Sequence, residues 1–260
     1  MIMHEFVSRG ATIRYRRAGA GRPLLFLDSE ESHGESGPFL DALAENFDVI
    51  APDHPGFGAS DTPDWFKGVG DIVYFYLDFM RALDLKGVHL AGASLGGWIA
   101  AEIAVRDSSS LASVHLLAPM GARLKGTPFG EIFMWTPEEN LRNRFHDEAL
   151  VGRLLARLRA RTHEEATAYL RDRYATARLG WHPRLYNPEL QRWLHRVDKP
   201  LQLLWGDEDK VVPLALANVW REAIPGARLS TFERCGHLPH VERATDVAGM
   251  ITSFAREVAP

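Results

Sequence analysis

A serine lies between two glycines where an apolar run gives way to an apolar segment of helical character. The stretch reads Gly92-Ala93-Ser94-Leu95-Gly96, after "VHLA" and before "GWIAAEIA". This G-x-S-x-G pattern is typical of a strained strand-to-helix turn that exposes a nucleophilic hydroxyl above the edge of a sheet. The alternative is a glycine-rich helix start with a capping serine. The preceding apolar run, together with the partners described next, favours the nucleophile.

A serine hydroxyl needs a base to become an effective nucleophile. Of the 11 histidines, His237 is the candidate base, because it directly follows a glycine in "CGHLPHVE", after the last expected strand. The nearby His240 is interpreted as a structural loop residue. A carboxylate must orient the base, and "LLWGDEDKVVP" offers Asp207, Glu208 and Asp209. The order serine, acid, histidine along the chain is known from one fold.

Short apolar runs bounded by turn residues predict strands that are buried on both faces. These runs cover residues 24–27, 48–52, 88–92, 113–119, 201–205 and 228–232. Longer helical patterns at 71–85, 94–107 and 245–259 lie between or after them. The alternation of strands and helices predicts an α/β fold with a mostly parallel central sheet and helices on both faces.

The segment 120–196 interrupts this alternation, because it reads as several helices, the first capped by Thr136 and opened by Pro137. We therefore predict a core domain made of 1–119 and 197–260, and a helical cap inserted at 120–196. Residues 142–196 contain 12 Arg, no Lys and 6 acidic residues, a balance of +6. A solvated helical face with local ion pairs explains this balance most simply, and a lid that attracts anionic substrates is the alternative.

Size and composition limit the classes of function. The chain has 260 residues, 46% of them hydrophobic, which suits one large α/β domain with an insertion. The formal net charge of -4 gives no overall basic excess for nucleic acid, and no segment approaches the about 20 apolar residues of a membrane span. The N-terminus lacks a signal-peptide pattern and Cys235 is the single cysteine, so we expect a cytoplasmic protein. The expected partner is a small-molecule substrate. The sequence does not indicate an oligomeric state.

Four stretches occur in a recognisable order along the chain: "VIAPDHPGFGASD" at 49–61, "GASLGG", "WGDEDKVVP" and "GHLPHVE". Together they resemble the loop before the elbow, the nucleophile elbow, the acid loop and the histidine loop of the α/β-hydrolase superfamily, specifically its lid-bearing Ser-His-Asp members. The family's G-x-x-D-x-x-x-P acid loop selects Asp209 over Asp207. The resemblance covers nearly the whole chain. It implies a catalytic triad of Ser94, Asp209 and His237, and hydrolysis through an acyl-enzyme without a metal or organic cofactor.

The loop after the expected strand 24–27 departs from the family pattern. The family usually carries His-Gly here, and the next residue usually supplies one backbone N–H to the oxyanion hole. This chain reads Asp28-Ser29-Glu30, so the resemblance assigns the two oxyanion donors to the backbone N–H groups of Glu30 and Leu95. The carboxylates of Glu30 and Glu31 would place negative charge near a site that must stabilise an oxyanion.

A serine at the elbow argues against the dehalogenases and epoxide hydrolases of the superfamily, which use an aspartate there. We expect Ser94 to cleave a carboxylic ester, or a related thioester or lactone. One alternative is carbon–carbon bond hydrolysis of meta-cleavage products (vinylogous diketones), with lid arginines binding the substrate carboxylate. Another alternative is a ligand-binding or inactive relative. Candidate substrate-binding residues are Ser29 and the lid residues Phe133, Trp135 and Trp181, whose alternative role is packing.

Overall fold

A sheet of eight strands forms the centre of residues 1–258, the part of the chain that this computed structural model describes. The strands are β1 (Ile2–Ser8), β2 (Ala11–Ala18), β3 (Pro23–Leu27), β4 (Asp48–Pro52), β5 (Val88–Ala93), β6 (Leu111–Leu117), β7 (Leu201–Gly206) and β8 (Arg228–Phe232). Strands β3 to β8 are parallel in the spatial order β4-β3-β5-β6-β7-β8. The prediction of an α/β fold with a mostly parallel sheet is confirmed, and the six expected runs correspond to β3 through β8.

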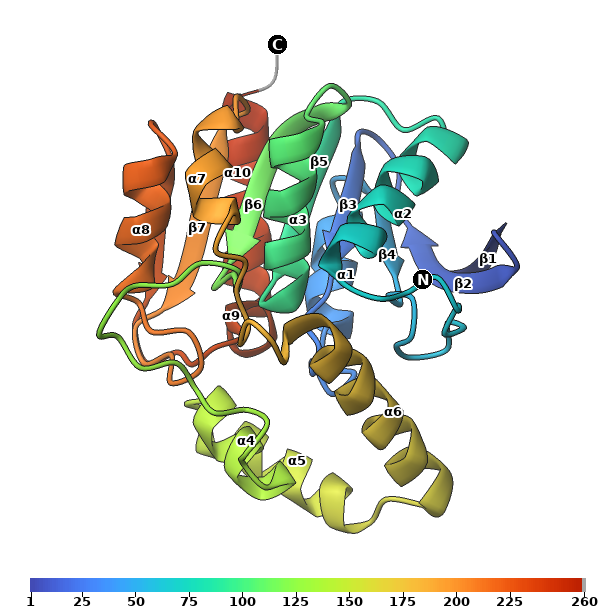
Figure 1. Cartoon of the computed structure of the whole chain (residues 1–260), viewed down its shortest axis with the longest axis vertical. Helices are drawn as coiled ribbons and strands as arrows, with labels where there is room; N and C mark the ends of the chain where they lie inside the picture. Colours follow the sequence, from blue (N-terminus) through green and yellow to red (C-terminus); the bar gives the residue numbers. More distant parts are fainter. Residues whose placement is uncertain (259–260) are drawn as a thin grey trace.

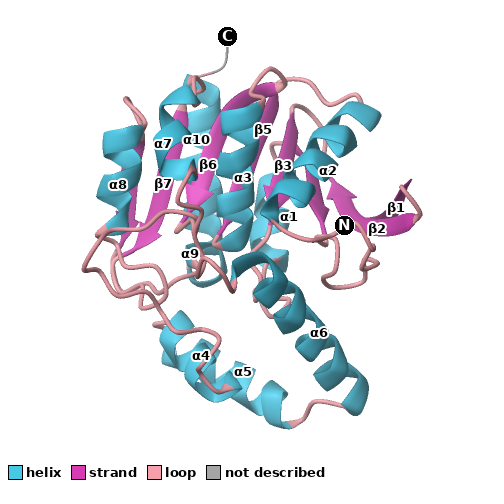
Figure 2. Ribbon diagram, viewed as in Figure 1, coloured by secondary structure: helices cyan, strands magenta, loops and turns pink. Residues whose placement is uncertain are grey.

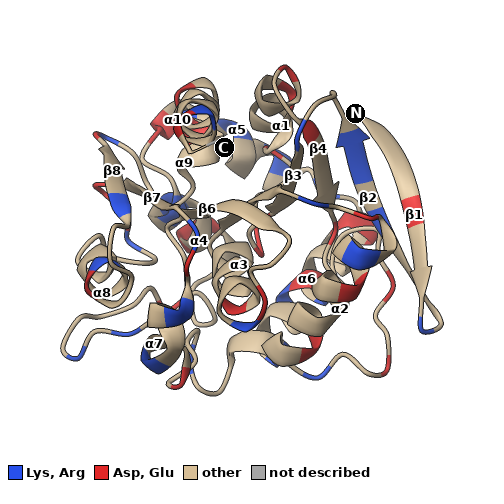
Figure 3. Cartoon of the chain, turned by 90° about the horizontal axis from the view of Figure 1, so that it is seen from above, with Lys and Arg blue, Asp and Glu red and all other residues tan. Residues whose placement is uncertain are grey.

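Strands β3, β5, β6 and β7 are built mostly from apolar and small residues, with His89, His115 and Gln202 as buried polar exceptions, and carry no Asp, Glu, Lys or Arg. In the view from above, the positions of charged residues accordingly fall mostly on helices, loops and the outer hairpin (Figure 3). Such strands tolerate burial on both faces, which explains why continuous apolar runs located them in the sequence.

The antiparallel β1–β2 hairpin at one edge of the sheet was not expected from the sequence. In β2, the buried residues Ala11, Ile13 and Tyr15 alternate with partly exposed ones. Alternation with period two belongs to a strand with one solvated face. A search for continuous apolar runs does not detect it.

Helices cover both faces of the sheet (Figures 1 and 2). One face packs against α1 (Gly37–Ala44) and α10 (Ala244–Glu257), and the other against α2 (Val69–Ala82), α3 (Leu95–Arg106) and α8 (Leu216–Ala223). The helices expected at 71–85, 94–107 and 245–259 correspond to α2, α3 and α10, although residue 259 lies outside the described part of the chain.

The chain between β6 and β7 contains α4 (Pro137–Arg144), α5 (Glu148–Arg159), α6 (His163–Gly180), α7 (Leu190–Trp193) and the 3-10 helix η1 (Leu194–Arg196). Helices α4 to α6 stand apart from the sheet, beyond its carboxyl edge, whereas α7 lies beside it with α8 (Figure 1). Thr136 caps α4 as expected, since its side chain accepts a hydrogen bond from the Glu139 backbone N–H at 3.2 Å. Within residues 1–258, we find no helix with the length and apolar character needed to span a membrane.

Candidate active site

Ser94 occupies a strained turn between β5 and α3. Its φ of 53° and ψ of -113° lie outside the helix and strand regions, a conformation that persists only when the surroundings enforce it. The two glycines make those surroundings possible. A Cβ on Gly96 would lie 2.0 Å from the Leu27 carbonyl oxygen, and one on Gly92 would lie 2.3 Å from the Gly96 carbonyl oxygen. The elbow therefore packs directly against the carboxyl end of β3.

The other two predicted triad residues lie on the loops that follow neighbouring strands. His237, after β8, places Nε2 2.7 Å from Ser94 Oγ, and its Nδ1 lies 2.8 Å from Asp209 Oδ2. Asp209, after β7, also accepts hydrogen bonds from the backbone N–H groups of Val211 and Val212, both at 2.8 Å. With Nδ1–H donating to Asp209, Nε2 is free to accept the serine proton. The structure thus brings the three residues into one buried hydrogen-bonded chain.

The competing residues have other partners. Asp207 is exposed, and its Oδ1 lies 3.5 Å from the Cys235 backbone N–H. Glu208 contacts His146 through Oε2 and Nδ1 at 2.8 Å. His240 points to a different carboxylate, since its Nε2 lies 3.3 Å from Asp28 Oδ1. These placements favour Asp209 and His237 over their neighbours.

The loop after β3 is fixed by buried polar contacts in place of the family's His-Gly. The Asp28 carboxylate accepts from the Ser29 backbone N–H and from the Ser36 hydroxyl, both at 2.7 Å. His54 Nε2–H donates to the Asp28 carbonyl oxygen at 2.9 Å, while Nδ1 accepts from the Tyr76 hydroxyl at 2.5 Å. Burial lowers the pKa of His54, so the ring stays neutral and holds this backbone in place.

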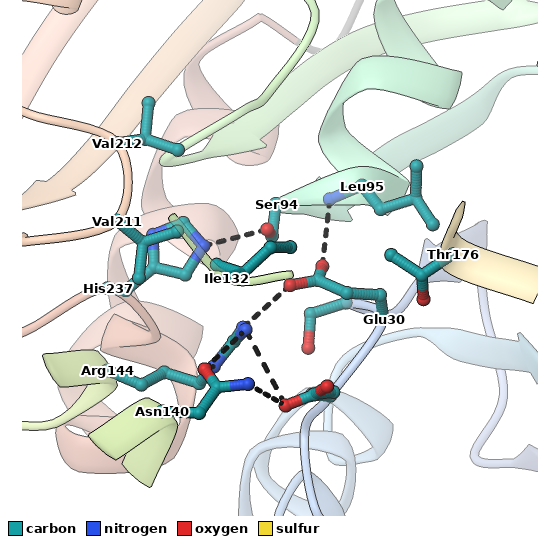
Figure 4. A network of polar contacts seen from close by, with 12 residues as sticks. Glu30, Ser94, Leu95, Ile132, Asn140, Arg144, Thr176, Val211, Val212 and His237 are labelled. Carbon is teal, nitrogen blue, oxygen red and sulfur yellow. Dashed lines mark hydrogen bonds and ion pairs between the residues drawn. The ribbon is translucent and has the colours of Figure 1, made fainter. Parts of the chain in front are cut away.

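A network of polar contacts joins this loop to α4 (Figure 4), and an ion pair joins it to α6. Arg144 Nη1 lies 2.8 Å from Glu30 Oε1, and both side chains are fully buried. Glu31 accepts a hydrogen bond from the Asn140 amide at 2.6 Å and pairs with Arg173 at 3.1 Å. The negative charge expected from Glu30 and Glu31 is therefore matched by two arginines.

The carboxylate of Glu30 points to the elbow. Its Oε2 lies 3.4 Å from the Leu95 backbone nitrogen, which donates to it. Burial alone raises the pKa of Glu30, but the charges of Arg144 and His237 and the residue's own backbone N–H outweigh burial and lower that pKa to about 2. The Leu95 backbone N–H that the sequence assigns to the oxyanion hole thus donates to an ionised side chain of this chain.

A cavity of about 330 Å³ lies beside the network, lined among others by Ser29, Glu30, Leu154 and Tyr169. Ser94 and His237 are fully buried and are absent from its described lining. Of the four candidate substrate-binding residues, Ser29 lines the cavity, and its hydroxyl has no partner among the described residues.

Phe133, Trp135 and Trp181, the three lid aromatics, are not among the described residues that line this cavity. Phe133 and Trp181 pack edge to face with ring centroids 5.3 Å apart, and the Arg184 guanidinium lies 4.8 Å from the Trp181 ring centroid. Trp135 packs on Gly130 and the core. These placements match the packing role that was the alternative.

Arg144, Asn140 and Arg173 were not identified from the sequence, although they contact the loop beside Ser94. The only signal in the sequence is the arginine-rich, lysine-free composition of the segment. Most of its arginines hydrogen-bond within the protein, which favours the simpler explanation of the +6 balance; they are Arg144, Arg157, Arg159, Arg171, Arg173, Arg178, Arg184, Arg192 and Arg196.

Within residues 1–258, no group of three or more His, Cys, Asp or Glu side chains is arranged to hold a metal ion.

Comparison with known proteins adds independent information. Residues 26–244 match the model of a family described as alpha/beta hydrolase fold. The chain is 29% identical to the dihydrolipoyllysine-residue acetyltransferase component of the acetoin cleaving system of Cupriavidus necator, over 93% of this chain and 66% of that protein. It is 27% identical to 2-hydroxymuconate semialdehyde hydrolase of a Pseudomonas species, over 98% of this chain and 94% of that protein. A solved meta-cleavage product hydrolase of Pseudomonas fluorescens superposes with a TM-score of 0.80 at 25% identity, over 98% of both chains.

Proposed function

The chain belongs to the alpha/beta hydrolase fold family, and from that premise we propose that it is a serine hydrolase that cleaves a carboxylic ester, or a related thioester or lactone, through an acyl-enzyme on Ser94. The observation that carries the proposal is the continuous hydrogen-bonded chain from Ser94 Oγ through His237 to Asp209. Ser-His-Asp constellations of this geometry activate serine for acyl transfer.

In the first half-reaction, Ser94 Oγ attacks the carbonyl carbon while His237 Nε2 takes the hydroxyl proton. The resulting imidazolium is stabilised by Asp209, which is itself held by two backbone N–H groups. The backbone N–H groups of Leu95 and Glu30 are the proposed donors to the oxyanion. As the intermediate collapses, the ester C–O bond breaks and His237 returns the proton to the leaving alcohol.

In the second half-reaction, a water molecule replaces the alcohol. The water oxygen attacks the acyl carbon while His237 takes a proton from the water. The bond between the acyl carbon and Ser94 Oγ then breaks, and His237 passes the proton to the serine oxygen. The products are a carboxylic acid and the restored enzyme. The chain's own residues supply each proton transfer in this scheme.

The helical segment 120–196 is proposed to act as a cap over this site, on a core made of 1–119 and 197–260. The support is that α4 and α6 reach the loop beside Ser94 through Arg144 and Arg173. Ser29 is the candidate for substrate contact that lines the adjacent cavity. A cytoplasmic location is part of the same proposal.

The test is covalent labelling by a fluorophosphonate, followed by intact-mass measurement and turnover of a chromogenic ester panel. We expect one adduct on the wild-type protein, located at Ser94, and none on Ser94→Ala. Absence of both acylation and turnover would favour an inactive or ligand-binding relative. An adduct on a different residue would refute Ser94 as the nucleophile.

A second candidate is hydrolysis of a carbon–carbon bond in a meta-cleavage product. Its support is the similarity to 2-hydroxymuconate semialdehyde hydrolase and to the solved meta-cleavage product hydrolase. A dienoate substrate carries a carboxylate, and Arg144 is a buried cation close to the elbow. Spectroscopic decay of a dienoate ring-fission product distinguishes the two candidates, since an esterase alone leaves its absorbance unchanged.

A further inference from the structure

The Glu30 side chain contacts a backbone N–H group that the proposed reaction needs for the oxyanion. Its Oε2 accepts a hydrogen bond from the Leu95 backbone N–H, with 3.4 Å between nitrogen and oxygen, and Glu30 is 4% exposed. A carboxylate oxygen and a tetrahedral oxyanion are both negatively charged hydrogen-bond acceptors, and one N–H can serve only one of them well. The described conformation therefore has an oxyanion donor that is already occupied by the protein itself.

Arg144 holds this carboxylate from the opposite side. Its Nη1 lies 2.8 Å from Glu30 Oε1, and its Nε–H and Nη2–H groups donate hydrogen bonds to Asn140 Oδ1 at 3.3 and 3.2 Å. The Arg144 carbonyl oxygen also accepts the His237 backbone N–H at 2.8 Å. The end of α4 thus contacts both the histidine loop and the side chain that fills the oxyanion site.

Glu30 also separates Ser94 from the neighbouring cavity. Glu30 lines the cavity, whereas Ser94 is fully buried. In the close view, the Glu30 carboxylate lies between the Arg144 guanidinium and the elbow formed by Ser94 and Leu95 (Figure 4). A carbonyl group that entered from this cavity would meet Glu30 before it reached the serine.

Resting on the proposed function, we propose that Glu30 is an internal occupant of the oxyanion hole, held by Arg144, and that a substrate carbonyl reaches Ser94 only after this carboxylate moves away. Movement of α4, which carries Arg144, is the natural way to release it. The Glu30 side chain therefore delays acylation, whereas the backbone N–H of the same residue remains a proposed donor to the oxyanion.

The experiment measures the rate constant for fluorophosphonate labelling of Ser94 in wild-type protein, Glu30→Ala and Glu30→Gln. We expect Glu30→Ala to label at least about tenfold faster, because removing a charge-assisted contact frees the donor. Glu30→Gln should fall between the two, since a neutral amide oxygen is a weaker acceptor. Loss of the folded triad would slow the labelling of Ser94, so unfolding alone does not explain a faster rate.

The matched control is Glu35→Gln. Glu35 also pairs with a lid arginine, Arg157 at 3.2 Å, but this pair lies near the surface and away from Leu95. We expect its labelling rate to equal that of wild type. If Glu30→Ala unfolds because Arg144 loses its nearest carboxylate, the double variant Glu30→Gln with Arg144→Met removes both charges and should label faster than wild type.

The outcomes separate the two proposals. Equal or slower labelling of folded Glu30 variants, with wild type still labelled at Ser94, would overturn the occupancy of the oxyanion hole and leave the serine hydrolase standing. No labelling of any variant under conditions that keep the protein folded would refute the proposed function. A faster rate in Glu35→Gln as well would show that loosening the lid, and not emptying the hole, is responsible.

Discussion

The two sides of the proposed active site are held by different kinds of interaction. On the triad side, Ser94, Asp209 and His237 are joined by hydrogen bonds of 2.7 and 2.8 Å within loops that directly follow strands. On the oxyanion side, Glu30 and Glu31 are held by the buried Arg144 and the partly exposed Arg173, from helices outside the sheet. The first arrangement is a hydrogen-bonded chain that ends in the single carboxylate of Asp209, whereas the second depends on carboxylate–guanidinium pairs out of water. We infer that chemistry resides on the first side and control of access on the second.

The largest effect that would test this division is on the triad side. Asp209→Asn should reduce kcat for the best ester by about 10⁴-fold, because an amide in place of the carboxylate favours the wrong tautomer of the His237 ring. Asp207→Asn, two residues away on the exposed part of the same loop, should change kcat by less than about twofold. The measurement is steady-state turnover of both variants. Comparable losses in the two would show that the loop as a whole, rather than Asp209, supports the base.

This contrast also explains what the sequence could predict. The triad motifs follow β5, β7 and β8, and parallel neighbouring strands end at the same edge of a sheet. The apolar runs and the loop residues that follow them were therefore enough to predict that Ser94 and His237 lie close together. The backbone donors at Leu95 and Glu30 rest on the family resemblance and stay a prediction; the pairing of Leu27 with Gly92 places the carboxyl ends of β3 and β5 next to each other.

The oxyanion side could not be predicted in the same way. The pairing of Arg144 with Glu30 spans 114 residues and joins a loop to a helix outside the sheet. No periodicity or strand order determines which of the 12 arginines in 142–196 reaches that loop. The sequence indicated negative charge near the site, but the direction of the Glu30 side chain depends on tertiary packing. For Phe133 and Trp181 the sequence left both packing and a substrate pocket open, and in the structure the two rings pack against each other.

A smaller but still large effect is expected on stability. Arg144→Met should lower the free energy of unfolding by about 3–5 kcal/mol, because it leaves the buried Glu30 carboxylate without its nearest cation. Arg157→Met removes a lid arginine whose side chain is 60% exposed, and should cost less than about 1 kcal/mol. Urea unfolding of both variants gives the comparison. Equal urea midpoints for the two variants would mean that the buried network stabilises the fold no more than a surface ion pair does.

The smallest expected effect is on the pH dependence of stability, which distinguishes a buried charged group, Glu30, from a buried neutral one, His115. In the sheet, His115 lies between Ser113 and Gln202, with Nε2 2.8 Å from the serine hydroxyl and Nδ1 3.2 Å from the amide oxygen. Burial lowers the pKa of His115 to about 3. Its unfolded pKa is about 6.5, so its contribution to stability is complete above that value and is lost as pH falls toward 3. The corresponding contribution of Glu30, whose pKa is lowered to about 2 from 4.5, is lost only below pH 4.5.

Between pH 6.5 and 5, one buried neutral histidine therefore reduces the free energy of unfolding by about 2 kcal/mol, at about 1.4 kcal/mol per pH unit. His115→Gln keeps a neutral side chain with a donor and an acceptor, and should make the unfolding free energy fall less steeply by that amount over this range. Glu30→Gln should leave the slope there as in wild type, because its carboxylate is ionised throughout in both the folded and unfolded chain above pH 5. Urea unfolding at half-unit pH steps measures all three slopes. If Glu30→Gln flattened this range and His115→Gln did not, the ionic side of the site, and not the sheet, would be the part of the fold that titrates first.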